Sequence, residues 1–96
     1  MFFLDLMMAT FLIKSLFKLT GRGSVLAGDI VDGKISGGDS IQVLPDKRPI
    51  KINSVEYVDY GKGRAEIGLM LGIVDENTVN ILETAIGQTV VIVESY

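Results

Sequence analysis

The 96-residue chain contains no cysteine, no histidine and no tryptophan. The lack of cysteine excludes disulfides and thiolate nucleophiles. The lack of histidine excludes imidazole metal ligands and every catalytic arrangement that uses a histidine base. Basic residues are fewer than acidic ones, nine against twelve, which gives a formal net charge of −3. This balance argues against a globally basic nucleic-acid-binding protein, although it leaves room for a local basic patch.

Long hydrophobic runs are also missing. The apolar start of the chain lacks a positively charged leader, contains Asp5, and then runs without charge only over residues 6–13. A membrane span needs roughly 20 residues. We therefore predict a soluble, cytoplasmic protein with no membrane partner. We interpret residues 1–10 as an apolar N-terminal extension that packs on the domain, with self-association into a homo-oligomer through residues 1–9 as the alternative.

Residues 11–96 are predicted to form a single domain, because the chain is too short for a second core. Eleven glycines and two prolines divide it into short segments, in which apolar residues recur mostly at every second position. This is the spacing of β-strands. The predicted strands are residues 11–19, 24–32, 40–44, 50–57, 64–71 and 89–94. Six short strands with glycine corners indicate an all-β closed barrel or a sandwich.

Three local features refine this prediction. Gly28 lies in the middle of a strand, which indicates a bulge, a bend or a close backbone approach. The apolar parity switches at residues 53–54, as a β-bulge would produce. The long connection from Gly72 to Gln88 has room for one helical turn, with Asp75 or Asn77 as its cap.

No motif in the sequence predicts a cofactor, a metal or catalysis. The segment from Gly33 to Gly38 has the glycine spacing of a phosphate-binding loop, but Asp39 follows where that loop requires a lysine. We therefore predict a plain turn and no bound nucleotide. The acidic residues form no EF-hand loop, and carboxylates on turns usually serve solubility. The chain is expected not to be an enzyme.

The basic residues fall into two small groups that have two interpretations, solvated surface or contacts to RNA phosphates. The first group lies on the first predicted hairpin, the second lies near the prolines, and nearby aromatic rings offer stacking faces. The basic groups are Lys14, Lys18 and Arg22, and Lys47, Arg48 and Lys51, and the aromatic residues are Phe17, Tyr57 and Tyr60.

The longest patterned run extends from Phe17 to Val43 and reads FKLTGRGSVLAGDIVDGKISGGDSIQV. Shorter segments follow in order: SVEY at 54–57, IGLMLGI at 67–73 and IGQ at 86–88. Together, over residues 11–95, they resemble the second domain of elongation factor Tu and related translational GTPases, which opens with Phe-x-Ile-x-Gly-Arg-Gly. This resemblance implies a small closed six-stranded Greek-key barrel. None of the motifs of the GTPase domain is present, so the resemblance implies a non-catalytic module.

In that family the domain lines the pocket for the aminoacyl end of tRNA. The resemblance places the remnant of this pocket at Phe17, Glu56, Asp59 and Glu66. Phe17 is retained, but Asp59 stands where the family has an arginine and Glu66 where it has an asparagine. Lys14 and Ser15 replace an acidic pair. These departures argue against binding of aminoacyl-tRNA.

The family's hairpin tip is retained as Gly21-Arg22-Gly23. In translational GTPases this tip approaches ribosomal RNA, and an exposed arginine can bind phosphate with two hydrogen bonds. Gly21, Arg22, Gly23 and Lys18 are therefore the candidate RNA contacts. We predict a translation-related binding module that docks on the ribosome, on RNA or on a translation protein. The alternative is a self-associating structural β-barrel without a nucleic-acid partner.

Overall fold

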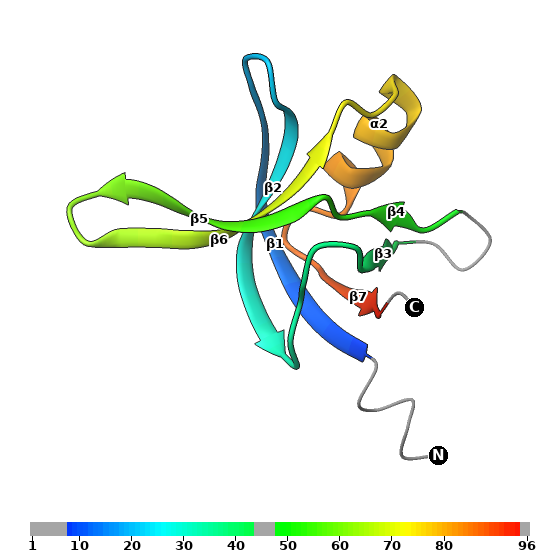
Figure 1. Ribbon diagram of the computed structural model, residues 1–96, viewed down its shortest axis with the longest axis horizontal. Helices are drawn as coiled ribbons and strands as arrows, with labels where there is room; N and C mark the ends of the chain where they lie inside the picture. The colour runs from blue at the N-terminus through cyan, green and yellow to red at the C-terminus, as the bar shows by residue number, and fades with distance from the viewer. Residues whose placement is uncertain (1–7, 44–47, 95–96) are drawn as a thin grey trace.

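The computed structural model describes residues 8–43 and 48–94, which form seven strands and one helix (Figure 1). The strands make one antiparallel sheet in the order β4-β3-β7-β1-β2-β6-β5. Their bounds are β1 Met8–Leu19, β2 Gly23–Asp32, β3 Ser40–Gln42, β4 Ile50–Lys51, β5 Ser54–Gly61, β6 Arg64–Gly72 and β7 Thr89–Val93, and the helix is α2 Glu76–Thr84. The prediction of a mainly β chain is confirmed.

The strand count and the pairing of the ends differ from the prediction of a closed six-stranded barrel. Among the described residues, no ladder joins β4 to β5, the two ends of the strand order. The seventh strand arises because the predicted strand 50–57 is divided, with β4 pairing to β3 and β5 to β6. The parity switch at residues 53–54 therefore marks a change of neighbouring strand rather than a bulge.

The first strand begins earlier than predicted and contains a bulge. Residues 8–10, which the sequence assigns to the N-terminal extension, belong to β1 and pair with β7. Further along, Ile13 pairs with Gly28 and Ser15 with Ala27, so Lys14 is an extra residue in β1. A side chain at position 28 would overlap the Leu12 carbonyl, which confirms the predicted close approach at this glycine.

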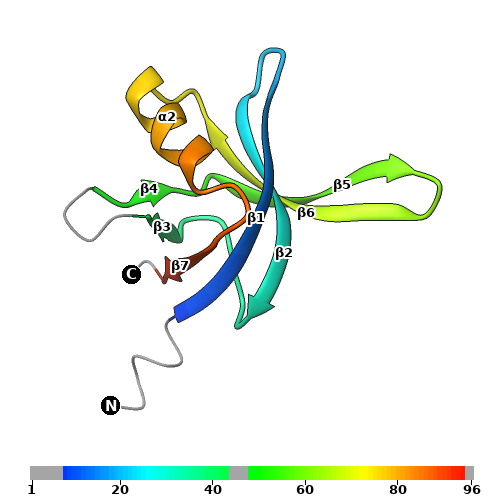
Figure 2. The same cartoon turned by 180° about the vertical axis from the view of Figure 1, so that it is seen from behind.

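The main core lies on one face of the sheet and is covered by α2 and by the loops. Its fully buried members include Phe11, Ile13, Leu26, Leu69 and Ile92. Figures 1 and 2 show α2 beside the end of β6 and above β4. Leu82 of the helix is fully buried in this core.

The helix begins where the sequence predicts but is longer than one turn. Asp75 is its N-cap, and its Oδ1 accepts a hydrogen bond from the backbone N–H of Thr78 at 2.7 Å. Such a bond satisfies one of the amide groups left open at a helix start. It also lowers the pKa of the Asp75 carboxyl. The helix then continues past its first turn, and Leu82 fixes it to the sheet by burial in the core.

Candidate functional site

Two hairpins extend away from the body of the molecule in different directions, as both views show (Figures 1 and 2). The β1–β2 hairpin ends in Gly21-Arg22-Gly23, the predicted RNA contact. The β5–β6 hairpin ends in Gly61-Lys62-Gly63. Each tip therefore carries one cation between two glycines.

The β1–β2 tip is a tight reversal, as predicted. Gly21 and Gly23 have positive φ values of 78° and 95°, and the backbone N–H of Arg22 donates to the Leu19 carbonyl at 2.9 Å. A side chain on Gly23 would overlap the backbone of Gly72, so this glycine is also required by packing against β6. The tip is thus fixed to the sheet, and Lys18 is exposed beside it.

Arg22 is held by an ion pair that the sequence did not predict. Its guanidinium nitrogen lies 2.5 Å from Glu56 Oε2, and the Arg22 side chain remains 53% exposed. The same oxygen accepts a hydrogen bond from Ser54 Oγ at 3.1 Å. The hydrogen bond from Arg22, followed by that from Ser54, lowers the pKa of the Glu56 carboxyl. A predicted pocket residue and a predicted RNA contact are therefore direct partners.

The register of the strands places three of the four predicted pocket residues on the face opposite the main core. Phe17 pairs with Val25, which in turn pairs with Met70 of β6. Gly68 and Glu66 are at alternate positions before Met70 and therefore share its face of β6. Glu56 pairs with Gly68, and Val58 pairs with Glu66. Directly paired residues share a face of an antiparallel sheet. Phe17, Glu56 and Glu66 therefore lie on this outer face.

Beneath these side chains lies a small second apolar layer. Val25 and Ala27 are fully buried and Met70 nearly so, although all three lie outside the main core cluster. Gly68 is part of this layer, because a side chain there would press on Val25 and Val58. The buried part of the outer face is therefore filled by the protein's own side chains.

The fourth predicted residue, Asp59, does not join the others. It lies next to Val58 on β5, and alternation along the strand turns it to the other side. Its Oδ1 accepts the backbone N–H of Gly61 at 2.8 Å, so the carboxylate stabilises the β5–β6 turn. Asp59 therefore has a local role in the hairpin.

Glu66 lies in a polar cluster that links four strands. Only 12% of its side chain is exposed, Tyr60 donates a hydrogen bond to it at 2.9 Å, and Lys14 Nζ lies 4.0 Å away. Lys14 also pairs with Asp29 at 2.7 Å. The hydrogen bond to Asp29 and its charge raise the pKa of the Lys14 ammonium, while burial and the bond to Glu66 raise that of the Tyr60 phenol.

Two residues at which the predicted resemblance is imperfect, Lys14 and Glu66, belong to this cluster. The fold brings their two opposite charges near each other. The acidic residues at 56, 59 and 66 each accept a hydrogen bond from a donor within the chain. The carboxylates that the sequence assigns to a pocket are therefore bonded to donors of the protein itself.

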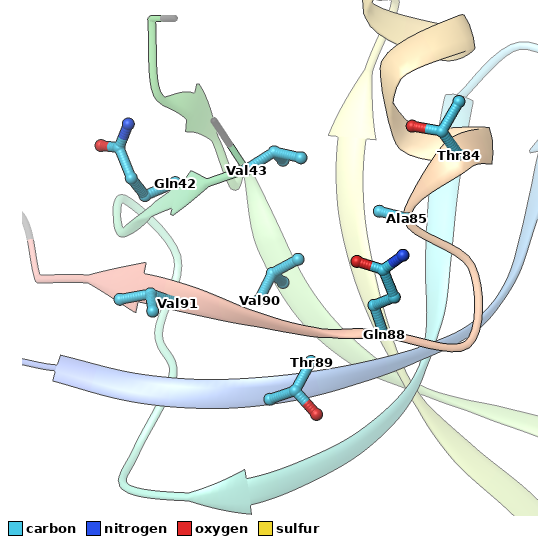
Figure 3. A pocket seen from close by; sticks show the side chains of 8 residues that line it. All are labelled: Gln42, Val43, Thr84, Ala85, Gln88, Thr89, Val90 and Val91. Carbon is cyan, nitrogen blue, oxygen red and sulfur yellow. The ribbon is translucent and has the colours of Figure 1, made fainter. Parts of the chain in front are cut away.

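A cavity that the sequence did not predict lies elsewhere, between β3, β7 and the end of α2 (Figure 3). Its volume is about 540 Å³. Val43, Val90 and Gln88 point into it, whereas Thr89 points away. The lining residues are Gln42, Val43, Thr84, Ala85, Gln88, Thr89, Val90 and Val91. All of them are uncharged, so the lining offers amides and hydroxyls but no acid or base near neutral pH.

The remaining predictions concern basic residues, metals and membranes. Arg48 and Lys51 are exposed, whereas Lys47 and residues 1–7 lie outside the described part of the chain. Within that part, no group of three or more acidic residues could hold a metal ion, and no helix is long and apolar enough to cross a membrane.

No protein-family model matches the chain. No solved structure matches it significantly.

Proposed function

We propose that the chain is a non-catalytic binding module of the translation-factor domain 2 type that docks on RNA, in the cytoplasm, through the tip of the β1–β2 hairpin. The observation that carries this proposal is the half-exposed side chain of Arg22 on a projecting tip that packs against β6 through Gly23. Lys18, four positions earlier on the same hairpin, is also exposed and adds a second cation to this end of the molecule. Arginine binds phosphate with a planar, forked set of donors, so a fixed position favours such contact.

We infer further that the sheet closes as a Greek-key barrel. The two end strands, β4 and β5, are separated only by Ile52 and Asn53. The backbone N–H of Ile52 donates to Asp39 on the β3 side at 2.8 Å, and that of Asn53 donates to Met70 on β6 at 2.7 Å. One nearly continuous segment thus bonds to both sides, as a strand that closes a barrel would.

A binding assay with matched tip variants tests the RNA proposal. Affinity for a labelled 20-nucleotide RNA stem-loop is measured by fluorescence anisotropy over a salt series for the wild type, Arg22→Ala and Lys62→Ala. The control removes the same charge between two glycines of the other hairpin. We expect Arg22→Ala to weaken binding severalfold and to reduce the salt slope by about 0.7 to 0.9, the value of one phosphate contact.

Two results would contradict the proposal. Equal losses from Arg22→Ala and Lys62→Ala would mean that the RNA responds to net charge and not to the β1–β2 tip. Absence of RNA binding by the wild type at low salt would remove the nucleic-acid partner altogether.

A second candidate function, structural self-association, is favoured by apolar residues at the other end of β1. Met8 pairs with Val93, and both side chains are more than a third exposed, as is Val31 on β2. Light scattering after gel filtration distinguishes the two functions. A salt-resistant oligomer that Val93→Lys converts to a 10.4 kDa monomer would support self-association.

A further inference from the structure

We propose that Glu56 acts as a built-in competitor of phosphate, so that its carboxylate masks Arg22 until an RNA displaces it. This inference rests on the proposed function, because it concerns the availability of the arginine that carries the RNA contact. It adds to that function a residue on a distant strand that sets the affinity and salt response of the tip.

The contact itself resembles the one that a phosphate would make. A single carboxylate oxygen of Glu56 lies 2.5 Å from an Arg22 nitrogen and also accepts the Ser54 hydroxyl. The donors of the guanidinium that face this oxygen are therefore occupied. A phosphate that requires the full fork of donors must replace the carboxylate or bind with fewer hydrogen bonds.

The location of Glu56 makes the competition intramolecular. Glu56 lies on β5, and 34 positions separate it from Arg22. The two side chains meet across β6, because β2 and β5 pair with opposite edges of this strand. A carboxylate that is part of β5 cannot diffuse away from the tip, unlike a free anion.

The charge of Glu56 also acts on any phosphate bound beside it. A phosphate held by Arg22 would lie well within one Debye length, about 8 Å at physiological salt, of the carboxylate. Solvent ions therefore screen this repulsion only in part. The Arg22–Glu56 pair is half exposed, so water weakens the contact and an RNA can displace the carboxylate.

A double-mutant cycle with the same RNA stem-loop tests the mask. The variants are Glu56→Gln, Arg22→Ala and the double variant, with Glu94→Gln as the control. Glu94 is exposed just past the end of β7, so its substitution removes one negative charge far from the hairpin tip. We expect Glu56→Gln to bind roughly two- to fivefold more tightly than the wild type, the range of an exposed ion pair, and more tightly than Glu94→Gln.

The cycle also shows whether the increase in RNA affinity depends on Arg22. In the Arg22→Ala background, Glu56→Gln is expected to change affinity no more than Glu94→Gln does in the wild type. The mask is overturned if Glu56→Gln binds like the wild type or less tightly, because Glu56 would then be neutral or would orient Arg22 for RNA. It is also overturned if the gain persists without Arg22.

These outcomes are separate from failure of the proposed function. If the wild type binds RNA through Arg22 and Glu56→Gln adds nothing, only the mask is wrong. If neither the wild type nor Glu56→Gln binds RNA, both proposals are wrong. Circular dichroism of each variant establishes that the fold is retained.

Discussion

The two projecting hairpins end in nearly identical tripeptides, yet their surroundings differ. At the β1–β2 tip, Gly23 lies against the backbone of Gly72 and Arg22 is paired with Glu56. At the β5–β6 tip, Gly61 and Gly63 have nothing within 4 Å of where a side chain would begin, and Lys62 has no ion pair among the described residues. The same local pattern therefore makes one tip part of the packed sheet and leaves the other in water.

The backbone conformation of the central residue also differs between the two tips. Lys62 has a φ of 56°, in the left-handed region that is unfavourable for most residues other than glycine and asparagine. Arg22 does not have a positive φ. Further along the β5–β6 hairpin, Tyr57 is 81% exposed. The difference teaches that a Gly-cation-Gly tripeptide predicts a turn but not the availability of its cation. Contacts from distant strands decide that availability.

The largest expected effect is a difference in stability between alanine variants of Gly23 and Gly63, the second glycine of each tip. Gly23→Ala adds a side chain against the Gly72 backbone at a positive φ, and we expect it to lower the free energy of unfolding by more than about 3 kcal/mol. Gly63→Ala meets no neighbour, so only the backbone cost of about 1 to 2 kcal/mol applies. Urea denaturation of both variants measures the difference. Equal losses would mean that Gly23 is needed only for its φ.

The next effect concerns the polar cluster that joins the two hairpins. Lys14→Glu places a third carboxylate beside Asp29 and Glu66, and we expect a clear drop in the midpoint of thermal unfolding. The matched control is Lys18→Glu, an exposed position on the same strand, which should shift the midpoint much less.

The charge-swapped variant Lys14→Glu/Asp29→Lys checks the cause of that drop. Restoring the opposite charges should recover part of the midpoint. If Lys14→Glu melts like Lys18→Glu, the cluster does not contribute to stability.

A smaller effect, of opposite sign, is expected at the exposed tip. Lys62→Gly removes the cost of a left-handed backbone and should raise the free energy of unfolding by up to about 1 kcal/mol. Arg22→Gly at the other tip should lower it, because Arg22 has no such backbone cost and loses its contact with Glu56. Chemical denaturation again provides the measurement. A loss of stability in Lys62→Gly would show that Lys62 has a stabilising contact of its own.

These comparisons also show which parts of the structure could be predicted from the sequence. Glycine turns and the Asp75 cap were predictable, because the conformation of a turn or a helix start depends on adjacent residues. Simple alternation along the predicted strand 11–19 would place Phe17 on the same face as Phe11 and Ile13, and the structure does not. The bulge at Lys14 reverses the alternation, so Leu16 packs on the main core and Phe17 lies on the outer face.

The site was less predictable than the fold. Three of its acidic residues were identified from the family pattern, but the partners of Glu56 and Glu66 were not. Arg22 pairs with Glu56 across 34 positions, and Lys14 approaches Glu66 across an even longer interval of the chain. Such pairs depend on the register of strands that are not neighbours in sequence. The cavity beneath α2 has no signal in the sequence, because the glutamines, threonines and valines that line it are ordinary strand and helix residues.

The smallest expected effect is a change in the titration of one carboxyl group. The hydrogen bond from Arg22 is the largest cause of the lowered pKa of Glu56, so Arg22→Ala should raise this pKa toward its ordinary value, and Ser54→Ala should raise it less. The pH titration of the Glu56 carboxyl carbon, followed by NMR, measures both changes. Lys62→Ala on the other hairpin should leave the titration unchanged.

The same ion pair predicts the sign of a pH effect on stability. A pKa that is lower in the folded than in the unfolded chain means that the Arg22–Glu56 pair stabilises the fold at neutral pH. This contribution is lost as the pH falls through the folded pKa, which lies below the ordinary glutamate value of about 4.3. The stability advantage of the wild type over Arg22→Ala should therefore fade in acid. If Glu56 titrates at the same pH in both proteins, the pair does not form in solution, and Glu56 cannot mask Arg22 by this contact.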